Sequence, residues 1–221
     1  MMRLRITFSK QGALRYIGHL DLHKIWERSL RRARLPLAYS RGFHPQPRIQ
    51  LAAALPLGFT SRAEVMDIWL NEDVPPTSLP TMLEGHLPAG LAILKVEEVD
   101  ARAPALQTEV VAAEYQVEIT GAGSGSSPEP AERSELTERL AAVMSAESLP
   151  RERRGKRYDL RPLIEELTVM GGCLFMRLSA RPGATGRPEE VLAVLGIRLE
   201  EACIERTGLL FEPPGSKPAW T

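Results

Sequence analysis

Residues 3–34 read RLRITFSKQGALRYIGHLDLHKIWERSLRRAR, a strand pattern followed by a helix pattern. In the first part, Leu4, Ile6 and Phe8 alternate with polar residues, the period of two that indicates a half-buried strand. In the second part the apolar residues recur at helical spacing on one face, and Pro36 ends the pattern. The stretch therefore opens the fold with a strand and an amphipathic helix.

The patterns that follow complete a β-α-β-β-α-β order. They are strands at 49–55, 65–70 and 91–99, with a helix that starts at Pro76 and continues through Leu87. This order is the split βαβ or ferredoxin-like unit, for which a chain of about 100 residues is long enough.

The second half repeats the order loosely. It has strand patterns at 115–119 and 204–211, helices near 136–144 and from Pro188, and a hairpin at 163–180 around Gly171-Gly172. We therefore predict an α+β fold of two tandem ferredoxin-like (βαββαβ) domains, residues 1–105 and 106–221. The second domain contains a flexible polar loop, 121–130, and a basic segment, 151–161, that does not fit the simple unit.

Several protein classes are excluded by composition. The longest apolar stretch, Leu51 to Phe59, is far shorter than the roughly 20 residues that span a membrane. Basic residues near the N-terminus interrupt any signal-peptide core, so we expect a cytoplasmic protein with no membrane contact. The only cysteines, Cys173 and Cys203, lie in apolar stretches and are expected to be buried thiols. No cofactor, bound metal or catalytic residue is predicted.

The charges are strongly segregated along the chain although the formal net charge is zero. Residues 1–62 contain 12 Lys/Arg against 2 Asp/Glu, net +10. Residues 63–150 contain 4 Lys/Arg against 16 Asp/Glu, net −12. Residues 151–221 contain 12 Lys/Arg against 10 Asp/Glu, net +2. Such asymmetry indicates either a polyanionic partner or internal pairing of oppositely charged segments.

The first helix carries a basic ridge, and the loop after it adds arginines and aromatic residues. Cations on one rigid element suit phosphates, and interleaved aromatic side chains suit the stacking of single-stranded RNA bases. The alternative to a binding role for the ridge is a solvated helix face. The alternative for Phe43 is a side chain that fills the core. The predicted nucleic-acid-binding residues of this half are Arg15, Tyr16, His19, Lys24, Arg28, Arg31, Arg32, Tyr39, Arg41, Phe43, His44 and Arg48.

A second basic cluster lies in the segment 151–161. It contributes Arg154, Lys156, Arg157 and Arg161 to the predicted nucleic-acid-binding set. On the first strand, by contrast, Arg3 and Arg5 are candidates to pair with Asp67 across the sheet.

The histidines give weaker signals. His19 and His23 are four residues apart, but the zinc-protease pattern is absent, so we favour helix capping or phosphate contact for His19. His44, or His19, is the candidate general base of a metal-independent endoribonuclease, because an imidazole titrates near neutral pH. Neither has a recognisable acid or base partner in sequence.

The segments Leu14–Asp21, Leu30–Ala33, Leu35–Ser40, Gly42–Pro45 and Leu55–Gly58 resemble the radical-SAM-linked protein family of bacteria. A weaker similarity continues through Tyr158–Pro162 and Arg187-Pro188. The resemblance implies a partnership with a B12-binding radical-SAM protein, and it implies no reaction for this chain.

Three functions follow as expectations. The first is an RNA-binding or adaptor protein that presents RNA to a separate radical-SAM enzyme, without catalytic activity of its own. The second is the metal-independent endoribonuclease. The tandem ferredoxin-like layout expected here is similar to that of CRISPR repeat-processing endoribonucleases, a likeness of fold that does not by itself imply the activity. The third is a protein–protein interaction module without nucleic acid.

Overall fold

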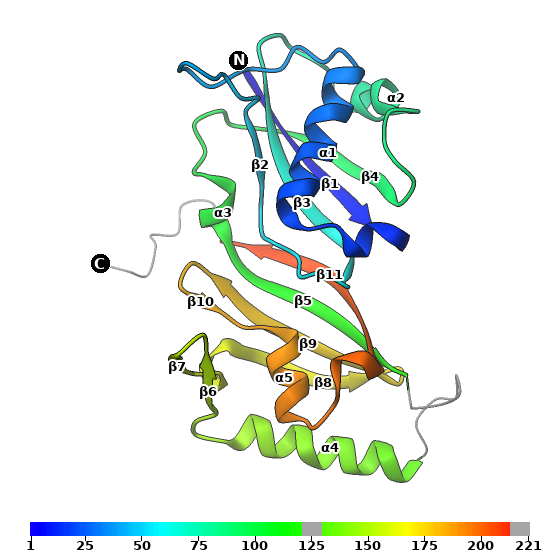
Figure 1. The fold of residues 1–221 in the computed structure, drawn as a ribbon, viewed down its shortest axis with the longest axis vertical. Helices are drawn as coiled ribbons and strands as arrows, with labels where there is room; N and C mark the ends of the chain where they lie inside the picture. The colour runs from blue at the N-terminus through cyan, green and yellow to red at the C-terminus, as the bar shows by residue number, and fades with distance from the viewer. Residues whose placement is uncertain (121–129, 213–221) are drawn as a thin grey trace. The chain divides into compact units, whose positions relative to one another are not determined.

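A computed structural model describes residues 1–120 and 130–212. The fold is α+β, and the chain divides into two compact units, Met1–Val110 and the part that begins at Val111 (Figure 1). The polar loop predicted at 121–130 lies, except for its last residue, outside the described residues.

The first unit contains a four-stranded antiparallel sheet with the order β2-β3-β1-β4. The strands are β1 (Met2–Lys10), β2 (Ile49–Leu51), β3 (Thr60–Leu70) and β4 (Leu91–Val99). The fourth strand has the predicted bounds. The second is shorter than expected, and the third begins five residues earlier, because residues 60–64 continue the antiparallel pairing with β1 past the apolar run.

Five helical segments accompany this sheet. They are η1 (Gly12–Tyr16), α1 (His19–Arg32), η2 (Pro76–Ser78), α2 (Leu79–Leu83) and α3 (Leu106–Glu109). The second α-helix ends four residues before the predicted Leu87, because Glu84 leaves the helical conformation and Gly85 takes a positive φ of 75°.

The core of the first unit lies between α1, α2 and one face of the sheet. Leu4, Ile6 and Phe8 of β1 are fully buried there, as the alternation predicts. Trp26 of α1 packs edge-on against Phe8, with ring centroids 4.8 Å apart. Pairing of aromatic rings in this geometry fixes the helix on the sheet, and it leaves the polar face of α1 toward solvent.

The predicted pairing of the first-strand arginines with Asp67 is confirmed. Asp67 is completely buried, and its carboxylate accepts hydrogen bonds from Arg3 Nε at 2.9 Å and Arg5 Nε at 2.9 Å. Arg5 also bonds Glu109 at 2.8 Å. Burial alone would lower the pKa of Arg5, but its bonds to Asp67 and Glu109 raise it above its ordinary value.

The second unit is built on the strands β5 (Val110–Ile119), β8 (Ile164–Met170), β9 (Cys173–Arg181), β10 (Ala184–Thr185) and β11 (Ala202–Phe211). Both β8 and β10 pair with β9 antiparallel, and the order continues β9-β5-β11. The helical segments are α4 (Pro130–Ser145), η3 (Arg161–Leu163), α5 (Pro188–Val194) and η4 (Leu199–Glu201). The hairpin around Gly171-Gly172 is where the sequence predicts it.

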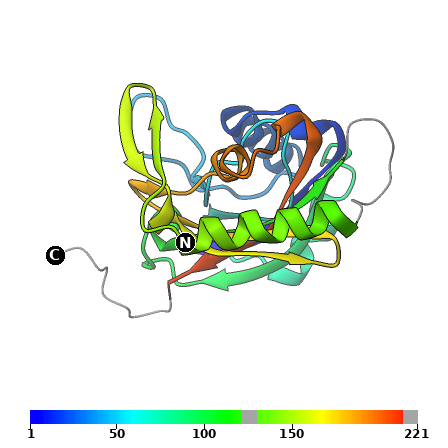
Figure 2. The same ribbon diagram turned by 90° about the horizontal axis from the view of Figure 1, so that it is seen from below.

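The basic segment that did not fit the simple unit forms an inserted hairpin. Its strands are β6 (Pro150–Arg153) and β7 (Lys156–Asp159), and they form a separate two-stranded sheet. Figure 2 shows this yellow-green hairpin projecting away from the green helix α4.

The prediction of buried thiols is wrong for Cys203, which is exposed on β11, while Cys173 is half-buried. Both are free cysteines. Each lies on a strand at a position where alternation turns the side chain away from its buried neighbours, Leu174 and Ile204.

Candidate nucleic-acid interface

The basic face of α1 is exposed because the opposite stripe of the helix is in the core. Leu22, Trp26 and Leu30 are buried at spacings of four residues. The cations lie on the other face and are all exposed, as predicted: Lys24, Arg28, Arg31 and Arg32. Residues three and four apart on a helix are neighbours, so these four side chains form one ridge.

Acidic groups compensate this ridge only in part. Lys24 pairs with Asp21 at 3.6 Å and Arg31 with Glu27 at 3.3 Å, and both lysine and arginine are half or more exposed. Such exposed pairs contribute little energy and exchange readily. Arg28 has no ion-pair partner within residues 1–120 and 130–212, so its charge is available to a ligand.

The loop that follows α1 is closed at its base. Tyr39 and Pro47 form an isolated antiparallel bridge, and the Ser40 N–H donates to the Gln46 carbonyl at 2.8 Å. The Gln46 N–H donates to the Ser40 hydroxyl at 3.0 Å. These bonds hold residues 41–45 as a closed tip, which we call the GFHP loop.

The tip of the GFHP loop is fully accessible. Phe43 is completely exposed, which excludes the alternative that it fills the core. Arg41 and His44 on either side are also exposed, and neither has a hydrogen-bond or ion-pair partner in the part of the chain that the structure describes. The phenyl ring of Phe43 is therefore accessible to a ligand.

The helix and the loop meet through a cation–aromatic contact. The Arg31 guanidinium lies 5.7 Å from the centroid of the Tyr39 ring. Tyr39 is 42% exposed, so the ring has a face in contact with solvent. The contact joins the basic ridge and the GFHP loop into one surface.

The 3₁₀ turn before α1 adds a second aromatic–basic pair. Tyr16 is exposed, and the Arg15 guanidinium lies 5.7 Å from its ring centroid. Arg15 Nε also donates to the Gly58 carbonyl at 2.8 Å, which fixes the side chain. His19 is half-buried at the first helical position, but the N-cap residue is Gly18, so the expectation that His19 caps the helix is wrong.

Arg48 is engaged in packing. Its guanidinium lies 4.6 Å from the Trp69 ring, and Arg3 lies 4.9 Å from the same ring. Trp69 is buried and Arg48 is half-buried. Stacking on an indole stabilises the arginine in place, so Arg48 supports the sheet more than it offers a free charge.

Arg34 is an exposed cation just after α1 that is not among the predicted binding residues. It follows α1 with a left-handed φ of 56° and donates its N–H to the Arg31 carbonyl, while Leu35 N–H bonds the Leu30 carbonyl. This is the Schellman motif, in which glycine is the favoured residue at the left-handed position. Arg34 lies two residues before Pro36, which marks the expected end of the helix. This position next to a helix end is the sequence signal that was missed.

We expect Arg34→Gly to raise the free energy of unfolding by about 0.5–1 kcal/mol, because it removes the left-handed strain of a side-chain residue. Urea unfolding measures the change. Arg28→Gly is the matched control: Arg28 lies inside α1, so this variant should lower stability by about 1 kcal/mol. A loss of stability in Arg34→Gly would contradict the strain argument.

The second basic cluster lies on the β6–β7 hairpin and lines a pocket of about 690 Å³. Three of its cations, Arg154, Lys156 and Arg157, are exposed members of the predicted set. The structure adds two that were not selected, Arg153 and Arg187. We call this the hairpin pocket.

The guanidinium group of Arg161 is hydrogen-bonded to the backbone of the second unit. Its guanidinium donates to the Met144 carbonyl at 2.9 Å and to the Ile164 carbonyl at 2.9 Å. It therefore satisfies the end of α4 and the start of β8, where helix and strand leave carbonyls without partners. These guanidinium contacts are internal, so Arg161 drops out of the candidate set.

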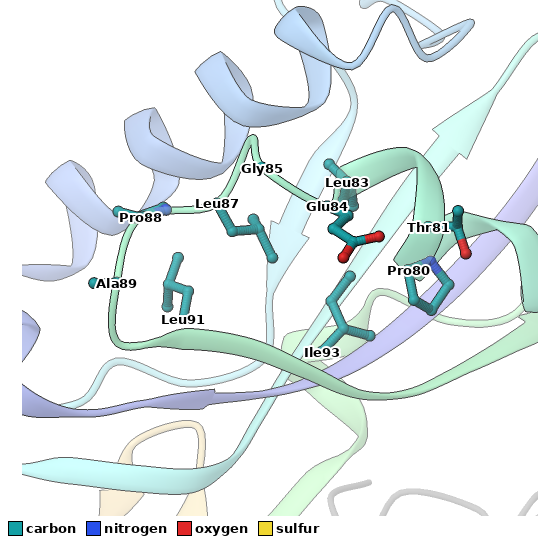
Figure 3. A pocket seen from close by; sticks show the side chains of 10 residues that line it. All are labelled: Pro80, Thr81, Leu83, Glu84, Gly85, Leu87, Pro88, Ala89, Leu91 and Ile93. Carbon is teal, nitrogen blue, oxygen red and sulfur yellow. The ribbon is translucent and has the colours of Figure 1, made fainter.

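A pocket of about 480 Å³ lies between α2 and β4 of the first unit. Figure 3 shows Leu87, Leu91 and Ile93 pointing into the same space, with Glu84 as the only charged residue of its lining. This lining has no cationic group for phosphate, and Glu84 is its one ionisable side chain.

Metal-binding clusters and membrane-spanning helices are both absent from the part of the chain that the structure describes. Residues 1–120 and 130–212 contain no cluster of three His, Cys, Asp or Glu side chains that would hold a metal ion. Within the same ranges no helix is both long and apolar enough to cross a membrane.

The comparison with protein families gives a match over most of the chain. The model of the family described as "Uncharacterized protein conserved in bacteria (DUF2344)" matches residues 3–188, which include α1, the GFHP loop and the β6–β7 hairpin. A search of curated proteins finds no match for the chain.

Proposed function

The chain belongs to this bacterial family, and we propose that it is a cytoplasmic RNA-binding or adaptor protein. The observation that carries the proposal is the fully exposed Phe43 on a closed loop, between two exposed cationic or ionisable side chains, Arg41 and His44. Bases of single-stranded RNA stack on such rings while arginines neutralise the phosphates.

The basic ridge of α1 supports the same proposal. Arg28 lacks an internal partner among the described residues, and Arg34 is held in a strained backbone conformation at the end of the helix. Strained residues persist where surrounding structure compensates their cost, and they cluster at functional sites. A ridge of cations next to an aromatic loop gives both phosphate contacts and base stacking.

The proposed architecture is two ferredoxin-like units in tandem. In the first unit the support is the element order β-α-β-β-α-β together with the antiparallel order β2-β3-β1-β4. In the second, β8-β9-β5-β11 is the corresponding order, with the β6–β7 hairpin inserted before β8. These strand orders are those that the split βαβ pattern produces.

The proposed partner is a B12-binding radical-SAM protein, to which this chain would present its RNA. The support is the resemblance of residues 14–58 to the radical-SAM-linked proteins. A pull-down with the purified radical-SAM protein of the same bacterium, with and without ribonuclease treatment, tests whether the two bind and whether RNA bridges them.

We expect Phe43→Ala to weaken binding of short single-stranded RNA about tenfold, because stacking of one base contributes about 1–3 kcal/mol. Fluorescence anisotropy with a labelled oligonucleotide measures the affinity. The melting temperature should stay unchanged, since the ring makes no core contact.

Leu94→Ala is the control for Phe43→Ala, because Leu94 is a large apolar residue that is 55% exposed on β4. It should bind RNA as the wild type does. Duplex RNA of the same sequence should bind more weakly than the single strand, since its bases are already stacked. Equal affinity of wild type and Phe43→Ala would leave the interaction-module function as the better explanation.

A further inference from the structure

The hairpin pocket has a strong excess of positive charge. Five of its lining residues are cationic, Arg153, Arg154, Lys156, Arg157 and Arg187, against one carboxylate, Asp159. Asp159 uses its Oδ1 to accept backbone N–H groups from Leu149 at 2.7 Å and Arg161 at 2.9 Å, and these bonds lower its pKa. Its charge is therefore committed to the backbone.

Neighbouring acids pair only loosely with these cations. Arg157 lies 3.7 Å from Glu152, with the arginine 91% exposed, and Arg187 lies 3.8 Å from Glu189. Arg153, Arg154 and Lys156 have no ion-pair partner in the ranges that the structure describes. Several cations that face one pocket repel one another, so an anionic ligand there gains electrostatic free energy.

Arg154 is placed against its backbone preference. It and Gly155 form the two-residue turn of the hairpin with φ values of 50° and 75°, as a type I′ turn requires. Asparagine or glycine is the favoured residue at this first turn position, and arginine is not. The hairpin thus places a guanidinium at the rim of a basic pocket at a cost in backbone strain.

The pocket is larger than a single phosphate and not wholly polar. Its volume of about 690 Å³ lies in the range of small-molecule sites. Leu163 and the Tyr158 side chain belong to the lining, and the Tyr158 hydroxyl is buried without a hydrogen-bond partner among the described residues. Because that hydroxyl is buried, Tyr158 and Leu163 offer the pocket apolar surface.

We propose that the hairpin pocket binds a phosphorylated nucleotide, with its arginines on the phosphates and Tyr158 and Leu163 packed against the nucleoside. Arginine forks match phosphate oxygens in pairs, which suits this lining. The nucleotide has two possible sources, a free nucleoside triphosphate and the 5′-phosphorylated end of an RNA. This inference goes beyond the proposed function and does not depend on RNA binding by the first unit.

The test uses Arg154→Asn in the full chain. Asparagine suits the left-handed turn position, so the hairpin should keep or gain stability while the pocket loses its guanidinium. We expect calorimetric affinity for ATP, or for an RNA oligonucleotide with a 5′-phosphate, to fall about tenfold, the effect of losing one charge-assisted hydrogen bond. Arg102→Asn removes an exposed arginine outside the pocket and should bind as wild type.

The probes separate the two sources. Binding of ATP that Arg154→Asn weakens identifies a free nucleotide. Preference for a 5′-phosphate over a 5′-hydroxyl oligonucleotide, lost in Arg154→Asn, identifies an RNA end. The proposal is overturned if neither probe binds, or if Arg154→Asn binds both as tightly as wild type. Phe43→Ala should leave ATP binding unchanged, so failure of this pocket and failure of the RNA surface give different results.

Discussion

Replacing Asp67 with alanine is expected to lower the free energy of unfolding by about 3–5 kcal/mol, the largest stability effect that we predict for a single substitution. The carboxylate is completely buried and bonds two arginines, one of which, Arg3, is only 1% exposed. Without it, the Arg3 guanidinium stays buried with no counter-charge, and restoring its hydration requires the sheet to open. Chemical denaturation monitored by circular dichroism measures the loss.

Two further variants keep this prediction testable if the alanine variant does not fold. Asp67→Asn retains the shape of the side chain and should still lose stability, because the charge is what balances Arg3. Glu97→Gln breaks the Lys95–Glu97 pair, whose side chains are 63% and 43% exposed, and should cost less than about 1 kcal/mol. If Asp67→Asn and Glu97→Gln lowered the free energy of unfolding equally, burial would not strengthen the ion pairs of Asp67 with Arg3 and Arg5.

Alternation and helical spacing predicted most strands of the fold. The buried face of β1 and the bounds of β4 follow directly from the order of apolar residues. The early start of β3 at Thr60 was not predictable, since Ser61 and Glu64 are polar residues that are nevertheless buried in the structure. Burial of such groups depends on partners elsewhere in the chain, which the local pattern does not contain.

The sequence predicted which residue types make up the candidate site, but not which of these side chains are available to a ligand. Sequence reasoning selected every cation of the α1 ridge, and it left Phe43 with two possible environments, one of which the structure excludes. It did not separate Arg161, whose donors bind backbone carbonyls, from Arg157, which is 91% exposed. The difference arises because Arg161 lies at the junction of α4 and β8, a tertiary contact that charge spacing does not encode.

The positive excess of residues 1–62 has two different structural outcomes. Arg3 and Arg5 neutralise acids inside the first unit, which is the internal pairing that the charge segregation allowed. Arg28 and Arg41 have no such partner within the described residues. Only the second group can release counterions on binding a polyanion, so the net charge of +10 overstates the charge available to RNA.

We therefore expect the double variant Arg28→Glu/Arg41→Glu to bind single-stranded RNA about 100-fold more weakly than wild type at low salt, because each reversal replaces attraction to a phosphate by repulsion. Binding isotherms at several salt concentrations give the salt dependence of the affinity. The slope of log K against log salt should become shallower by about 1.4, since each phosphate contact to a single strand contributes about 0.7.

Folding of the double variant should be intact, because both side chains are exposed and outside the core. Arg3 and Arg5 provide the contrast: they lie in the same basic segment, but their guanidinium groups bind Asp67 and cannot reach a ligand without unfolding the sheet. A variant at Arg5 would therefore lower stability before it changed the salt slope. An unchanged slope in Arg28→Glu/Arg41→Glu would remove these two residues from the interface and leave Phe43 stacking without its electrostatic counterpart.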